Sequence, residues 1–78
     1  MKLNANQLLE MVIAEIKYLK QGEEFLVKDL FKGYQWNRIA RNERLLLGRL
    51  FLNYVTNSRV NLVAIEKTSS GQQRYRLN

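Results

Sequence analysis

Residues 42–57 read NERLLLGRLFLNYVTN and residues 63–77 read VAIEKTSSGQQRYRL, and these two stretches decide the fold. The first stretch repeats apolar residues with a helical period, which predicts an amphipathic helix that Asn42 caps and that ends near Asn57. Its wide apolar face comprises Leu47, Leu50, Phe51, Tyr54 and Val55, whereas Leu45 and Leu52 fall on the opposite side. We expect Gly48 to admit a close neighbour such as the Trp36 ring, because glycine in a helix interior otherwise costs about 1 kcal/mol.

The second stretch alternates in the manner of a β-strand on both sides of a turn at residues 68–72, so it predicts a β-hairpin. We expect its core face to carry four apolar residues, namely Val63, Ile65, Tyr75 and Leu77. Since successive strand residues point to opposite faces, Arg74 and Arg76 then project from the other face.

The residues before these stretches predict shorter elements. Asn4 and Gln7 form a capping pair for a first helix that runs to about Gln21, and Gly22 supplies the left-handed residue that ends it. A short strand follows near residues 24–27, and a short helix at residues 28–31 is closed by Gly33. An aromatic connector at residues 34–36 then leads into another helical turn at residues 37–40. This order predicts an α+β winged helix-turn-helix: three helices, a short strand and a C-terminal hairpin wing, as one domain over residues 1–78.

The composition excludes most kinds of catalysis. Cysteine, histidine and proline are all absent, which removes disulfides, thiol nucleophiles, the usual general base and the commonest metal ligands. No stretch approaches the roughly 18 apolar residues of a membrane span. We therefore expect a cytoplasmic protein that is not an enzyme and that needs no cofactor or metal.

The charge is strongly asymmetric along the chain, whose formal net charge is +6. Residues 1–27 hold three basic against four acidic residues, a net charge of −1, and residues 28–78 hold ten against three, a net charge of +7. One side of the molecule is thus expected to be positive, which is typical of nucleic-acid binding, and the first helix should face away from that ligand.

Nine residues form the predicted nucleic-acid site. Arginine binds phosphate with a planar fork, and aromatic rings stack on bases. The predicted residues cluster at the entry to the long helix, on the wing and in the aromatic connector: Tyr34, Trp36, Arg38, Arg41, Arg44, Arg49, Lys67, Arg74 and Arg76. Two of them have a structural alternative, since Arg44 lies near the apolar face and can be an anchor, and Trp36 can fill the core.

The long helix also bears on the kind of nucleic acid. Its outer side carries Arg49, Asn53 and two leucines, so few of its side chains can hydrogen-bond to base edges in a duplex groove. The pattern favours single-stranded DNA with little sequence preference. Two alternatives stay open: a duplex-binding transcriptional regulator, and a protein-interaction module whose partner docks on Leu45 and Leu52.

The spacing of several short elements carries a resemblance to a known family. These elements are Gly22-Glu23-Glu24-Phe25, Lys28-Asp29-Leu30-Phe31, Trp36, Arg44 and Leu47-Gly48-Arg49-Leu50-Phe51. Over about residues 8–77 the chain resembles the domain of unknown function family 1413, small proteins of Gram-positive bacteria and their mobile elements. The resemblance implies a winged helix-turn-helix that binds single-stranded DNA in the replication of mobile DNA. Trp36, Arg44, Gly48 and Arg49 match the family pattern, whereas Val27 stands where a helix-capping threonine is more usual.

Overall fold

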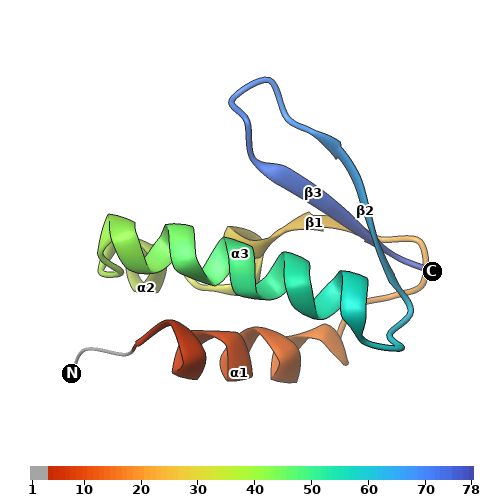
Figure 1. Cartoon of the computed structure of the whole chain (residues 1–78), viewed down its shortest axis with the longest axis horizontal. Coiled ribbons are helices and arrows are strands. Elements are labelled where there is room, and N and C mark those ends of the chain that lie inside the picture. Colours follow the sequence, from red (N-terminus) through yellow and green to blue (C-terminus); the bar gives the residue numbers. More distant parts are fainter. Residues whose placement is uncertain (1–3) are drawn as a thin grey trace.

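A computed structural model describes residues 4–78 and shows an α+β fold of three α-helices and a three-stranded antiparallel sheet (Figure 1). In chain order the elements are α1 (Ala5–Ile16), β1 (Glu24–Leu26), the 3₁₀ helix η1 (Val27–Leu30), α2 (Gly33–Asn37), α3 (Arg41–Asn57), β2 (Leu62–Lys67) and β3 (Gln73–Leu77). Helix α3 lies between α1 and the sheet, and the β2–β3 hairpin projects away from the helices (Figure 1). No helix within residues 4–78 is long and apolar enough to cross a membrane.

The predicted cap of α1 is confirmed, but its predicted end is wrong. The Asn4 side chain accepts from the Gln7 amide at 2.9 Å, and the Gln7 side chain accepts from the Asn4 amide at 3.0 Å. The helix ends at Ile16 instead of Gln21, because amides in the next turn bond three residues back, as Leu19 does to Ile16. Gly22 does take positive φ, at 89°, and its amide bonds to the Leu77 carbonyl, so it turns the chain into the sheet.

The middle of the chain folds as short elements whose positions differ in part from the prediction. The strand near residues 24–27 is present, and the 3₁₀ helix after it begins at Val27 because the Asp29 carboxylate accepts from the Leu26 amide at 2.9 Å. The helical turn predicted at residues 37–40 is wrong. Helix α2 starts instead at Gly33, where the Gln35 side chain accepts from the Lys32 amide, so the aromatic connector is itself helical.

Helix α3 has the predicted face and end, and a different start. Leu47, Phe51 and Val55 are buried, whereas Leu45 and Leu52 are exposed. Its first residue is Arg41 and its cap position is Ala40, so Asn42 lies inside the helix and does not cap it. The expected close approach at Gly48 is also wrong, because no described atom apart from its chain neighbours and the backbone of its own helix lies within 4 Å of where its Cβ would be.

The hairpin is confirmed, but the predicted face of β2 is inverted. The sheet has the order β1-β3-β2, and the Cα partners pair Leu62 with Leu77, Val63 with Arg76, and Ala64 with Tyr75. Residues that lie opposite each other share a face, so Leu62 faces the core with Tyr75, and Val63 faces the other way. Pairing register sets the faces, and a one-residue difference from the predicted register exchanges them. Beyond Ala64 the register shifts, so the alternation does not continue regularly through Ile65.

Three aromatic rings hold the sheet against α3. Phe51 meets Tyr75 edge-on with ring centroids 4.8 Å apart, and Phe25 stacks on Tyr75 at 5.8 Å. Leu8 and Val12 of α1 belong to the same buried cluster. Aromatic pairs of this geometry contribute about 0.5–1.5 kcal/mol beyond their buried area. The packing therefore fixes the hairpin relative to α3, and this relation shapes the surface between them.

Candidate nucleic-acid interface

A groove of about 530 Å³ lies between α3 and the β2–β3 hairpin, and we call it the hairpin groove. Five basic side chains line it, and among residues 4–78 no aspartate or glutamate does. The cations are Lys28, Arg41, Arg44, Arg49 and Lys67. The other lining residues are apolar, glycine or glutamine: Leu26, Val27, Trp36, Leu45, Gly48, Leu52, Gly71, Gln72, Gln73 and Tyr75. A groove walled by one sign of charge attracts a polyanion.

One ridge of α3 forms a wall of the groove. Arg41, Leu45, Arg49 and Leu52 are spaced four, four and three residues apart, so they follow one another along the same side of the helix. All four side chains are exposed. At about 1.5 Å of rise per residue, the ridge from Arg41 to Leu52 is roughly 16 Å long. Cation and leucine therefore alternate along a length that several nucleotides can occupy.

Arg44 joins α3 to α2 at the end of the groove. Its Nη2 donates to the Trp36 carbonyl at 2.9 Å, and its guanidinium lies 5.1 Å from the centroid of the Trp36 ring. The Trp36 ring also packs against the Phe31 ring, and the two ring centroids are 5.7 Å apart. The geometry therefore gives Arg44 the anchoring role that the sequence left open. Trp36 is half-buried and packs against the core, as its structural alternative predicted, and it also lines the groove.

The other wall comes from η1 and the hairpin. Lys67 ends β2, and Gln72 and Gln73 follow the hairpin turn, in which the Thr68 amide donates to the Gln72 carbonyl at 2.8 Å. Lys28 of η1 faces the same groove. The sequence prediction did not include Lys28, which lies far along the chain from the arginine cluster at the start of the long helix, and the fold brings it to the same groove.

Two predicted residues of the hairpin lie outside the groove. Tyr75 lines the groove, so its neighbours Arg74 and Arg76 point to the other face of the sheet. There the Arg74 Nη1 lies 3.7 Å from a Glu24 carboxylate oxygen and 3.3 Å from one of Glu66. Cross-strand carboxylates thus offset the Arg74 charge, and the structure does not bring this pair of arginines to the five groove cations.

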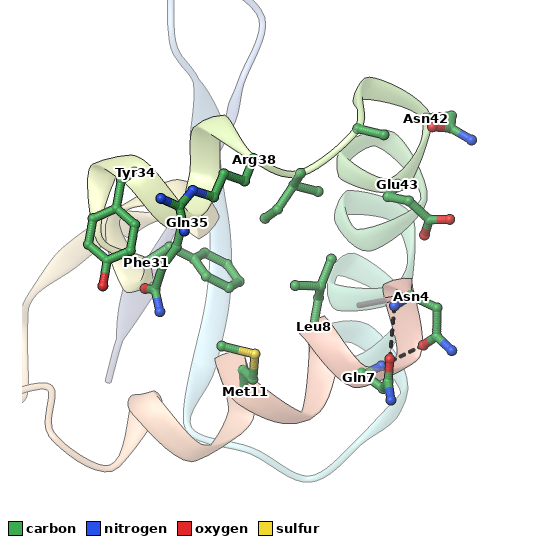
Figure 2. A pocket seen from close by; sticks show the side chains of 12 residues that line it. Asn4, Gln7, Leu8, Met11, Phe31, Tyr34, Gln35, Arg38, Asn42 and Glu43 are labelled. Atoms are coloured by element: carbon green, nitrogen blue, oxygen red, sulfur yellow. Dashed lines mark hydrogen bonds between the residues drawn. The ribbon is translucent and has the colours of Figure 1, made fainter. Parts of the chain in front are cut away.

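Two more predicted residues, Tyr34 and Arg38, line a separate pocket of about 480 Å³ that we call the α2 pocket. Figure 2 shows it between the starts of α1 and α3 and helix α2. The Arg38 guanidinium lies 5.0 Å from the centroid of the exposed Tyr34 ring. Glu43 of α3 lines the same pocket, so its charged groups are of both signs and it lacks the uniform charge of the hairpin groove.

Burial raises the pKa of the Tyr75 hydroxyl to about 12, because desolvation penalises the phenolate. Tyr75 lines the hairpin groove, and its burial extends the pH range over which the hydroxyl stays neutral. Within the described range, α1 contributes no residue to the hairpin groove, although it lines the α2 pocket. Residues 4–78 also hold no group of three or more histidine, cysteine, aspartate or glutamate side chains that could bind a metal.

The fold and this site define a small α+β protein with a basic groove between its long helix and its hairpin. The chain belongs to the family described as a domain of unknown function (DUF1413), which matches residues 10–76 and confirms the family resemblance. A solved structure named "SCCmec type IV LP1413 - nucleic acids binding protein" is similar to this chain with a TM-score of 0.72 and 21% sequence identity. The match covers 94% of this chain and 85% of the other, and at that identity it shows the shared fold. No curated protein matches the chain.

Proposed function

We propose that this protein is a non-enzymatic winged-helix domain that binds single-stranded DNA in the hairpin groove with little sequence preference. The observation that carries the proposal is the lining of that groove, with five cations and, among residues 4–78, no carboxylate. A similar fold belongs to a protein named as nucleic-acid binding, which supports the class of ligand. The family resemblance adds a role in the replication or maintenance of mobile DNA, and the absence of cysteine fits a cytoplasmic location.

Single strands are favoured over duplex by what α3 presents to the groove. A helix that reads duplex sequence needs polar side chains aimed at base edges, whereas two of the four positions on this ridge are leucines, which cannot hydrogen-bond to a base edge. Arginine on phosphate provides affinity for any sequence. The two groove glutamines, Gln72 and Gln73, lie on the hairpin instead, and the Gln73 amide already donates to the Ile65 carbonyl.

Fluorescence anisotropy with matched single- and double-stranded oligonucleotides at several salt concentrations tests the proposal. We expect tighter binding of the single strand and a steep salt dependence. If each of the five cations neutralises one phosphate, the logarithm of the association constant should fall with the logarithm of salt with a slope of about −3.5. Equal affinity for both forms, or a flat salt dependence, would refute the proposal.

A protein-docking role is the second candidate function, because Leu45 and Leu52 are exposed instead of buried. Apolar docking depends little on salt, and it should proceed without nucleic acid. Sedimentation of the purified chain, alone and with an oligonucleotide, separates the two functions. Self-association that an oligonucleotide does not disturb would favour docking.

A further inference from the structure

Three large apolar side chains are exposed on α3, and they differ in their surroundings. Leu45 is 59% exposed and Leu52 is 38% exposed, and both line the hairpin groove among its cations. Leu46 is 45% exposed and does not line it. Single exposed leucines are common on protein surfaces, but two that alternate with arginines along one ridge form a pattern with a consequence for binding.

We propose that Leu45 and Leu52 contact the faces of unpaired bases, and that Arg41 and Arg49 bind the phosphates that link these bases. This inference rests on the proposed function and names the residues that select a single strand. In a duplex the base faces are stacked on one another, and only their edges reach the grooves. In a single strand the faces are free, and an apolar side chain beside the phosphate sites removes them from water.

The two aromatic residues that line the hairpin groove, Trp36 and Tyr75, are less free for this role than the two leucines. The Trp36 ring is engaged by Phe31 and by the Arg44 guanidinium. Tyr75 is 1% exposed, and Tyr34 lies in the α2 pocket. The apolar surface that the hairpin groove offers to a base is therefore largely aliphatic, and it lies on the ridge of α3.

The backbone of α3 leaves room for a base between the two leucines. Gly48 lies between them in the helix and lines the groove, and among the described residues no atom beyond its chain neighbours and its own helix backbone is within 4 Å of where its Cβ would be. A base that rests against Leu45 or Leu52 therefore meets open space at Gly48. Lys67 faces this ridge across the groove and provides a third cation for the strand.

The test compares Leu45→Ala combined with Leu52→Ala against the matched control Leu46→Ala on the same helix. Each protein is titrated with three labelled probes of equal length: oligothymidine, an abasic oligonucleotide with the same number of phosphates, and a duplex. We expect the double variant to bind oligothymidine about tenfold more weakly and to bind the abasic probe within about twofold of the wild type. The control should behave like the wild type with all three probes.

The outcomes separate this inference from the function on which it rests. If the double variant binds oligothymidine as the wild type does, or loses affinity equally for the abasic probe, the base contact is overturned and groove binding stands. If the wild-type protein binds none of the probes, the proposed function fails and this inference fails with it. If the double variant keeps its oligonucleotide affinity but loses self-association in sedimentation, the leucines dock a second copy and the inference is overturned. Circular dichroism melting should show unchanged folding, because the substituted side chains are exposed. Leu45→Gln gives a second variant, since glutamine also has a high helix propensity.

Discussion

Removing three cations from the hairpin groove should reduce both the affinity for single strands and its salt dependence. The variant combines Arg41→Gln, Arg49→Gln and Lys67→Gln, and it retains Arg44 because that side chain anchors Trp36. Each phosphate contact on a single strand contributes about 0.7 to the slope of log affinity against log salt, so the slope should become shallower by about 2. At about 0.1 M salt the same loss corresponds to an affinity on the order of 100-fold weaker.

The assay is anisotropy of labelled oligothymidine across a salt series, with a control of equal charge. The control combines Lys17→Gln, Lys20→Gln and Arg59→Gln, three exposed cations that do not line the groove. Both variants lower the formal net charge of +6 by three, so a nonspecific effect of net charge predicts equal losses. A control that loses as much slope and affinity as the groove variant would refute the assignment of the groove.

Four further predictions concern stability and the groove residues. Gly48→Ala should stabilise the protein by about 0.5–1 kcal/mol in urea unfolding, because the helix gains propensity and the added methyl meets no described atom within 4 Å; a destabilised variant would contradict this. Arg44→Ala should destabilise it by about 1.5–3 kcal/mol through loss of the charged hydrogen bond to the Trp36 carbonyl, and a neutral effect would show that Arg44 is no anchor. Trp36 fluorescence should change on addition of oligothymidine, since the ring lines the groove, and an unchanged spectrum would argue against binding there. The raised pKa of Tyr75, about 12 against 10.0, gives stability that is fully present below pH 10 and is lost as the pH rises toward 12. Tyr75→Phe should make the pH dependence of melting in that interval shallower, and an equal slope in both proteins would contradict the burial effect.

Local sequence signals predicted the elements that local interactions determine. The Asn4–Gln7 capping pair and the buried stripe of α3 depend on residues three or four apart, so a periodic pattern was sufficient to locate them. The end of α1 was placed too late because Leu19 continues the apolar period even though the chain has already left the helix. Leu19 packs against the core from a turn, and sequence periodicity does not distinguish such a contact from a helical one.

The face of β2 depends on pairing with β3, which sequence alternation alone does not determine. Val63 and Ile65 are β-branched apolar residues on either side of the small Ala64, and they were predicted to face the core. The pairing of Leu62 with Leu77 sets the opposite face, and the shift in register after Ala64 then breaks the alternation.

The site was predicted in part, because charge is visible in a sequence and its neighbours in space are not. The cluster of arginines at the entry to the long helix indicated Arg41 and Arg49 correctly as neighbours in one groove. The prediction treated Arg74 as a cation that is free for a ligand, whereas Glu24 and Glu66 on two other strands offset its charge. The sequence placed Leu45 and Leu52 beside Arg49 on the outer side of the helix, and the fold adds Lys28 and Lys67 to the same groove.

Chemical-shift mapping with a single-stranded oligonucleotide tests most directly whether the hairpin groove is the binding site. In a titration of ¹⁵N-labelled protein with oligothymidine, we predict that the largest amide shifts lie at residues 41–52 and 67–73. The amides of α1 should be nearly unchanged, because that helix does not line the groove. Shifts centred on α1 or on the α2 pocket, with residues 41–52 unaffected, would contradict this assignment.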